Sequence, residues 1–268
     1  MLPTSEARWR HSWEVLRLKD EKEKKQLMNS KGIRLDGRKW DELRPIKLEV
    51  GVLKNADGSA YIEWGKNKIM AAVYGPKEVH PKHQVLPDRA LVRSRYHMAP
   101  FSVDERKNPA PSRREIEISK VIREALEPAI VVEDYPRTAI EVWVEVLQSD
   151  GGSRVAGITA ASLALADAGI NMRDMVVGCS CGIIEDQVVA DLDDTEDKEG
   201  SGDMPVAMMP NLNQITLLQV DGIYTRENFQ KAFELAIEKD KQVYAMQREA
   251  LTRKYFGNGV NMAAGEEE

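Results

Sequence analysis

PRTAIEVWVEVLQSDGGSRVAGITAASLALADAGI, residues 136–170, is the stretch of sequence that decides the fold. Residues 138–147 alternate in polarity and are rich in Val, with one Trp, which predicts a half-buried strand. Residues 155–169 are mostly small and apolar, which predicts a helix that ends at Gly169. The segment DGGSR, residues 150–154, joins the strand to the helix. This strand–glycine–helix unit indicates a domain that mixes sheet and helix.

The segments before this unit predict further strands and one helix. We expect strands at residues 44–53, 58–64, 68–74 and 91–98. Asp57-Gly58 is a hairpin signal between the first two strands. Ser112 and Glu115 form a capping box, which starts an amphipathic helix at about Arg113.

The segments after Gly169 complete the predicted fold. Strands are expected at residues 175–184, 187–192, 205–209 and 214–220, with an acidic loop after the second of them. A long C-terminal helix is expected from Thr225. The fold class is therefore α+β, with mixed sheets covered by about three helices.

The two ends of the chain differ from the middle in composition. Residues 1–30 are dense in charge and predict a solvated N-terminal extension, and residues 257–268 read as an acidic tail. Residues 31–256 between them are expected to form a single domain.

The composition is that of an ordinary globular protein. The 268 residues include 38 Lys and Arg against 44 Asp and Glu, a net charge of −6, which argues mildly against a nucleic-acid binder. The longest uncharged, largely apolar stretch, residues 155–166, is shorter than the roughly 20 residues that span a bilayer, so no membrane is expected. Only two cysteines occur, which favours a reducing, cytoplasmic setting.

The glycine junction is a candidate anion site. Gly151 and Gly152 allow the backbone to approach a ligand closely, and the helix that follows offers free N–H groups and a positive dipole end. Ser153 adds a hydroxyl, and Arg154 adds a bidentate donor for an oxyanion. Inorganic phosphate or a carboxylate would suit this site, and an ordinary glycine turn with a solvated arginine is the alternative.

A basic segment and an acidic segment stand out against the net charge. Residues 80–114 hold eight Lys and Arg against three Asp and Glu, with aromatic residues between them, which suits a single strand of nucleic acid. Residues 185–203 hold nine carboxylates and one lysine. Carboxylates near a phosphate substrate commonly hold Mg²⁺. A solvated basic face and an acidic surface loop remain the alternatives.

The sequence Gly178–Gly182 matches the G-x-S-x-G pattern of hydrolases. That pattern requires a strand, a turn and a helix, with the catalytic histidine after the serine. Here a second strand is expected next, and all four histidines precede Ser180. We therefore reject a serine hydrolase, and expect Cys179 and Cys181 to be buried on one strand face.

Five segments of the chain carry a resemblance to a known family: residues 33–46, 86–102, 108–130, 136–170 and 203–222. Together they resemble the RNase PH family, and within it the catalytic RNase PH-like subunits of archaeal exosomes. The resemblance covers nearly all of residues 33–256 and implies a single RNase PH-type domain of the ribosomal protein S5 domain 2-like fold. It also implies phosphorolysis, in which inorganic phosphate attacks the 3′-terminal phosphodiester of RNA and releases a nucleoside diphosphate, with RNA tailing as the reverse reaction.

The resemblance also implies roles for particular residues. The phosphate loop of the family maps onto Gly152, Ser153 and Arg154. The catalytic and metal-binding aspartates, for Mg²⁺ or Mn²⁺, map onto Asp197 and Asp203. The residues expected to contact RNA are Arg113 and Arg114, which would hold the 3′ end, with Arg93, Arg95, His80 and Lys82. Pro205 departs from related polynucleotide phosphorylases, which carry a lysine there.

The resemblance finally implies partners. A related non-catalytic subunit would alternate with this chain in a hexameric ring of three heterodimers, capped by RNA-binding subunits of the S1/KH type. His80 and Lys82 lie where the family has a loop facing the central pore. Two alternatives remain, a homohexameric RNase PH that trims transfer RNA and a non-catalytic RNA-binding ring subunit.

Overall fold

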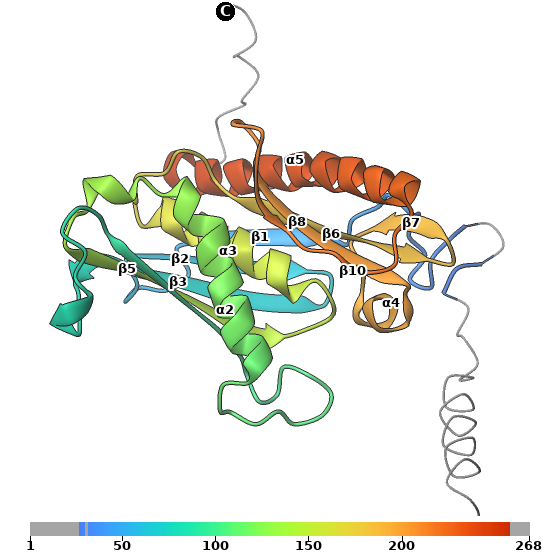
Figure 1. The fold of residues 1–268 in the computed structure, drawn as a ribbon, viewed down its shortest axis with the longest axis horizontal. Helices are drawn as coiled ribbons and strands as arrows, with labels where there is room; N and C mark the ends of the chain where they lie inside the picture. Colours follow the sequence, from blue (N-terminus) through green and yellow to red (C-terminus); the bar gives the residue numbers. More distant parts are fainter. Residues whose placement is uncertain (1–26, 30–31, 258–268) are drawn as a thin grey trace, which may run out of the picture.

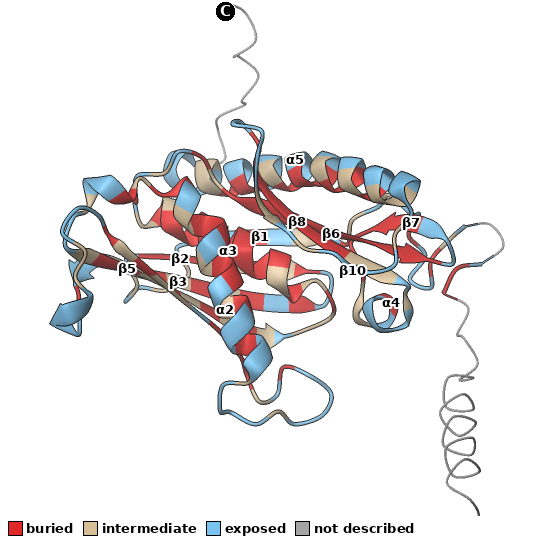
Figure 2. Ribbon diagram, viewed as in Figure 1, coloured by how far each residue is buried: buried red, intermediate tan, exposed pale blue. Residues whose placement is uncertain are grey.

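Helix α3, Ser153–Asp167, lies between two β-sheets and is buried along almost its whole length (Figures 1 and 2). The computed structural model describes residues 27–29 and 32–257. Small side chains let both sheets approach the α3 backbone. At Gly157 even a Cβ would lie 3.3 Å from the Val144 side chain. The predicted strand–glycine–helix unit is therefore the centre of the fold.

The first sheet has five strands in the order β1-β2-β3-β5-β4. All neighbours pair antiparallel except β4 and β5, which are parallel and are joined through helix α2, Arg113–Leu126. Helices α2 and α3 cover one face of this sheet (Figure 1). The strands are β1 Ile46–Val50, β2 Gly58–Trp64, β3 Asn67–Glu78, β4 Leu91–Met98 and β5 Thr138–Gln148.

The second sheet has the order β10-β8-β6-β7, and β9 pairs with β8 on a branch. It packs against α3 and against α5, Arg226–Phe256. Its strands are β6 Val177–Ile184, β7 Gln187–Ala190, β8 Gly202–Met209, β9 Gln214–Leu218 and β10 Asp221–Gly222. Cys179 and Cys181 are free thiols buried on β6, as expected.

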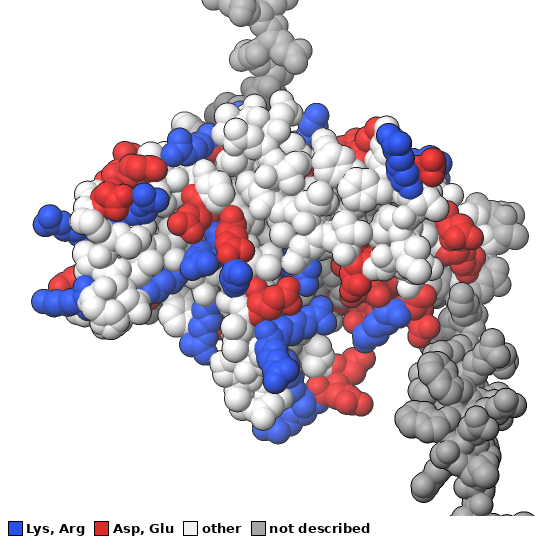
Figure 3. Space-filling view, viewed as in Figure 1, with Lys and Arg blue, Asp and Glu red and all other residues white. Residues whose placement is uncertain are grey.

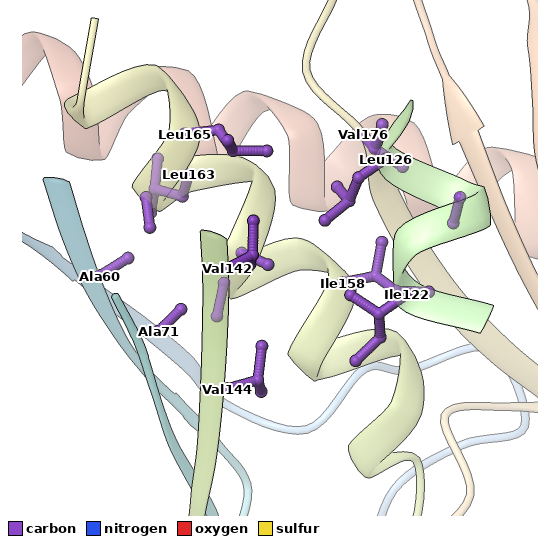
Figure 4. Close-up of a cluster of buried hydrophobic side chains, with 14 of the residues drawn as sticks. Ala60, Ala71, Ile122, Leu126, Val142, Val144, Ile158, Leu163, Leu165 and Val176 are labelled. Atoms are coloured by element: carbon purple, nitrogen blue, oxygen red, sulfur yellow. The ribbon is translucent and has the colours of Figure 1, made fainter. Parts of the chain in front are cut away.

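The core forms where the elements meet α3. Figure 4 shows Ile158, Leu163 and Leu165 of α3 with Val142 and Val144 of β5, close to apolar side chains of α2. Each such side chain contributes roughly 1.5–3 kcal/mol when it is fully buried. The predicted α+β class with mixed sheets and few long helices is confirmed, and no described helix is both long and apolar enough to cross a membrane.

Two details differ from the sequence-based expectations. The acidic segment expected as a loop contains a short helix, α4, Asp194–Glu199, which begins with a capping box of Asp193 and Glu196. Leu27 and Met28, expected within the solvated extension, are buried against residues of the β6–β7 region. Most of the extension, residues 1–26 and 30–31, and the tail after Gly257 lie outside the described residues.

Candidate active site

A pocket of about 550 Å³ brings together basic and acidic residues from distant parts of the sequence. Arg114 comes from α2, Arg154 from α3, Asp197 from α4 and Asp203 from β8. Figure 3 shows basic side chains over the start of α2 and acidic ones over α4. The remaining lining residues are Glu117, Gly200, Ser201, Gly202, Pro205, Gln219, Val220, Asp221 and Gly222.

The basic residues of the pocket, Arg114 and Arg154, lie in the first turns of α2 and α3. The α2 capping box fixes the first turn, in which Arg114 and Arg113 are exposed. Arg114 lines the pocket, whereas Arg113 is not among the lining residues. Two arginines in the first turn oppose the helix dipole, which favours an anion beside them. The structure thus places one member of the predicted pair directly in the pocket.

Arg154 is held toward the same pocket by polar neighbours. Its guanidinium donates a hydrogen bond to Oε1 of Gln219 and lies 4.0 Å from the carboxylate of Glu117. The side chain is largely buried, with 22% of its surface exposed. A guanidinium held in this way is preorganised for an oxyanion.

The rest of the predicted phosphate loop lies at the start of α3. Gly151 and Gly152 have φ angles of +68° and +64°, a conformation that favours glycine. Gly152 is the N-cap of α3, and no side chain caps that helix. Ser153 is buried, and its hydroxyl shares a 2.8 Å hydrogen bond with the Tyr96 hydroxyl. Of the three predicted phosphate-binding residues, Arg154 lines the pocket, whereas Gly152 and Ser153 are not among the lining residues.

The two aspartates of the pocket lie in different surroundings. Burial and, to a smaller extent, the charge of Asp197 raise the pKa of Asp203 to about 6, against the opposing effect of a hydrogen bond donated by Ser180. Asp197 keeps an exposed surface, but the protein around its carboxyl excludes water and raises its pKa. Arg114 acts in the opposite direction on Asp197. A carboxyl with a raised pKa can carry a proton for general acid catalysis.

The two carboxyls also suit a magnesium ion. Mg²⁺ is commonly held by one or two protein carboxylates together with substrate phosphates and water. Asp197 and Asp203 line one pocket, and the charge of Asp197 raises the pKa of Asp203, a repulsion that a divalent cation would relieve. Among the residues that the structure describes, no group of three or more His, Cys, Asp or Glu could hold a metal by itself. The residues present therefore fit a metal shared with a phosphate substrate.

The other predicted RNA contacts lie away from this pocket. Arg93 binds the carbonyl oxygen of His80 at 2.7 Å and the side chain of Gln84 at 2.6 Å. Arg95 lies over the Trp143 ring, 5.1 Å from its centroid. These side chains belong to β4 and the loop before it, and their RNA contacts remain predictions.

The exposed loop between β3 and β4 carries the two remaining predicted contacts. His80 and Lys82 each lie 3.8 Å from the carboxylate of Glu78. This loop is drawn in teal in Figure 1, at the opposite end of the molecule from α4. It could contact a strand of RNA only at a distance from the aspartates.

Several residues in or beside the pocket carried no signal in the sequence. Gln219 and Glu117 contact Arg154, Tyr96 contacts Ser153, and Ser180 contacts Asp203. Their partners are distant in the chain, so only the tertiary fold reveals these contacts. Ser180 lies within the continuous strand β6, which agrees with its rejection as a hydrolase nucleophile.

Comparisons with known proteins identify the class to which this fold and pocket belong. Sequence models of the 3′ exoribonuclease family match residues 42–171 as its domain 1 and residues 174–239 as its domain 2. The chain belongs to this family, which confirms the resemblance.

Named relatives are similar over almost their whole length. The Exosome complex component Rrp41 of Pyrococcus furiosus is 66% identical over 230 residues, which cover 86% of this chain and 92% of that protein. The protein of the same name from Thermococcus onnurineus is 63% identical over 240 residues, covering 90% and 96%. A crystal structure of rice Rrp46 is 25% identical, with a TM-score of 0.73, and covers 81% of this chain and all of that one.

Proposed function

We propose that this chain is the catalytic subunit of an archaeal RNA exosome, a phosphate-dependent exoribonuclease that shortens RNA from its 3′ end. The observation that carries the proposal is the single pocket that holds Arg114, Arg154, Asp197 and Asp203. A similarity of 66% identity to an exosome component supports it. A non-catalytic subunit would have no need to keep this charged set together.

The arrangement of the pocket suggests how phosphorolysis would proceed. Arg154 and the first turn of α3 orient inorganic phosphate, and Arg114 holds a phosphate of the RNA 3′ end. An oxygen of the inorganic phosphate attacks the phosphorus of the last phosphodiester. The bond to the 3′ oxygen of the preceding nucleotide breaks, and Asp197 gives that oxygen a proton. The products are a nucleoside diphosphate and an RNA shorter by one nucleotide.

Asp203, together with Asp197 in its ionised form, would hold Mg²⁺, or Mn²⁺, which supplies neutralisation of negative charge on the phosphates when it is bound. The hydroxyl of Ser180 donates a hydrogen bond to one carboxylate oxygen of Asp203, a residue that lines the pocket. Pro205 lies in the pocket wall where polynucleotide phosphorylases carry a lysine. In this chain the neighbouring cations are arginines instead.

The proposal includes ring partners and a cytoplasmic location. Ile215, Leu218, Val220 and Ile223 are exposed apolar residues on and beside β9 and β10, and Val220 also lines the pocket. An apolar surface of this kind suits a protein partner. We propose that a related non-catalytic subunit covers it in a hexameric ring of three heterodimers, with S1/KH-type subunits as the cap.

A phosphate-dependence assay tests the proposal. The chain, with and without a co-expressed ring partner, is incubated with a 3′-labelled RNA in the presence or absence of phosphate and Mg²⁺. We expect nucleoside diphosphates only when both are present, and the Asp197→Ala variant serves as the inactive control. Release of monophosphates without added phosphate would contradict phosphorolysis.

The same assay separates the two alternatives. An active homohexamer formed without a partner would favour an RNase PH that trims transfer RNA. RNA binding without turnover in any combination would indicate a non-catalytic ring subunit.

A further inference from the structure

The carbonyl groups of the glycine junction are held by two buried side chains. The guanidinium of Arg44 donates hydrogen bonds to the carbonyl oxygens of Asp150 and Gly151, the second at 3.3 Å. The amide of Asn67 donates to the same Gly151 oxygen at 2.6 Å and accepts from the Asp150 N–H at 2.7 Å. Neither side chain was singled out from the sequence, and both residues are buried.

These bonds fix how the junction presents its N–H groups. A trans peptide group is planar, and its C=O and N–H bonds point in opposite directions. Binding the Gly151 oxygen therefore directs the N–H of Gly152 away from Arg44 and Asn67. The carbonyl oxygen of Gly151, whose partial negative charge would repel an anion, instead accepts hydrogen bonds from the buried side chains of Arg44 and Asn67.

Arg44 also connects the junction to the acidic segment. Its guanidinium lies 2.6 Å from Oδ1 of Asp191, and Oδ2 of the same carboxylate accepts a hydrogen bond from the Trp64 indole at 2.9 Å. Burial alone would raise the pKa of Asp191, but the charge and hydrogen bonds of Arg44 outweigh this and hold that pKa below its usual value. Asp191 has a φ of +56°, an unusual backbone conformation that these contacts maintain.

The glycine junction and the acidic segment also contact each other directly, at Gly151 and Asp193. A Cβ placed on Gly151 would lie 2.5 Å from the backbone carbonyl carbon of Asp193. Asp193 is the N-cap of α4, the helix that carries Asp197. The position of the glycine junction relative to Asp197 thus depends on contacts made by Arg44 and Asn67.

We infer that Arg44 and Asn67 are positioning residues for phosphate, holding the glycine junction at a fixed place relative to α4 and Asp197. The inference rests on the proposed function and deepens it, because it names what orients the phosphate site. Neither residue is among those that line the pocket, so they act through the backbone of residues 150–152.

Steady-state kinetics of the ring complex test this inference. The variants are Asn67→Ala and Arg44→Lys, and phosphate and RNA are varied separately. We expect Asn67→Ala to raise the KM for phosphate about tenfold, the effect of losing a hydrogen bond that orders the site. The KM for RNA should stay within about twofold, a difference below the usual worth of one hydrogen bond.

A matched control distinguishes positioning from general destabilisation. Gln247 is another buried amide, and it donates to the carbonyl oxygens of Thr159 and Val176, away from the junction. Gln247→Ala should lower thermal stability and leave the KM for phosphate unchanged. The inference would be overturned if Asn67→Ala lowered thermal stability as Gln247→Ala does but left the KM for phosphate unchanged.

A binding measurement separates this inference from the proposed function. Inorganic phosphate should raise the Tm of the native complex, and this rise should be smaller in Asn67→Ala and in Arg44→Lys than in Gln247→Ala. If the native complex releases no diphosphate, the proposed function fails, while a selective loss of the phosphate-dependent rise still supports the positioning role. Equal rises in all variants would contradict the role whether or not the complex is active.

Discussion

At the scale of the residue, Asp203 illustrates a conflict between stability and function. The carboxyl is largely buried, its pKa is about 6, and Asp197 adds a repulsive charge, so the ionised form at pH 7 costs free energy. Active sites commonly retain such groups because chemistry requires them. The hydrogen bond from Ser180 offsets only part of the cost.

Replacing Asp203 by Asn is therefore expected to stabilise the protein and abolish turnover. The neutral amide keeps an oxygen for the Ser180 hydroxyl and removes the buried charge, which should add about 1–2 kcal/mol to the free energy of unfolding at pH 7. Urea unfolding without Mg²⁺ measures this difference. At pH 4.5, where Asp203 is already protonated in the native state, the gain should be much smaller. A variant less stable than the native protein at pH 7 would contradict this account.

Arg113 and Arg114 offer a second test at this scale, since they are adjacent in sequence but only Arg114 lines the pocket. We expect Arg114→Glu to weaken RNA binding more than Arg113→Glu, and the double variant to weaken it further. Fluorescence anisotropy with labelled RNA at several salt concentrations measures the affinities, because each lost phosphate contact lowers the salt dependence of binding. Equal RNA affinity of the double variant and the native protein would show that the arginines were wrongly assigned.

At the scale of the element, α2 depends on Glu115 at its start. The carboxylate accepts hydrogen bonds from the backbone N–H groups of Ser112 and Met98, and Lys107 Nζ lies 2.6 Å from it. Burial alone would raise the pKa of Glu115, but Lys107 and these hydrogen bonds lower it to about 2. One side chain thus joins the helix to β4 and to the loop that precedes Arg114.

The lowered pKa of Glu115 predicts acid sensitivity. Its stabilisation is fully present above pH 4.5, the unfolded-state value, and is lost as the pH falls from there toward 2. After allowance for solvent screening we expect a loss of about 1–2 kcal/mol over this range. Urea unfolding between pH 5 and pH 3, compared with Glu115→Gln, measures it. The variant should be less stable at pH 7 and show a weaker pH dependence, and parallel pH profiles would contradict the assignment.

The elements were predicted from sequence where local signals are strong. Strand β4 and the start of α2 fall at the expected residues, because polarity alternation and a capping box are local features. Helix α4 was missed because six residues made mostly of Asp and Glu have no apolar face to reveal a helix. Its existence depends on the buried Glu196, whose partner Arg34 is 162 residues away.

The site was predictable to a similar extent. Arg114, Arg154, Asp197 and Asp203 could be proposed because their residue types and neighbours suit anions or metals, and the resemblance supplied their roles. That they share one pocket follows only from tertiary structure. Arg44 and Asn67 could not be found, since a buried polar residue in or before a strand has no local signature.

At the scale of the whole molecule, residues 32–44 connect the two halves of the fold. Arg34 forms a buried ion pair with Glu196 of α4, and Arg38 lies 3.5 Å from the carboxylate of Asp191. The Arg34 side chain is fully buried, and it also donates to the carbonyl oxygens of Ala190 and Asp191. Residues 32–44 therefore hold the acidic segment in place through the buried contacts of Arg34 and Arg38.

Removing one partner of this ion pair should be costly. Arg34→Met removes the nearer guanidinium partner of the buried Glu196 and leaves only Arg38, 3.8 Å away, so we expect a loss of up to about 3–5 kcal/mol in the free energy of unfolding. The double variant Arg34→Met, Glu196→Leu should recover much of that loss, because buried ion pairs are often replaceable by apolar residues. Urea unfolding of all four proteins gives the coupling energy. Additive effects of the two single substitutions would show that the pair is not coupled.

The division of the pocket between distant segments has a consequence for the synthesis of the chain. Arg114 and Arg154 are made first, Asp197 and Asp203 follow, and the wall at Gln219–Gly222 comes last. A nascent polypeptide that ends at residue 171 already contains the whole of α3, but it has neither aspartate and no second sheet. The chain must therefore emerge from the ribosome as far as Gly222, about four fifths of its length, before a complete pocket can form. The basic groups proposed to bind an RNA end are synthesised before the acidic groups proposed to act on it, so under the proposed function a ribosome-bound chain cannot degrade the message that encodes it while its first half is being made.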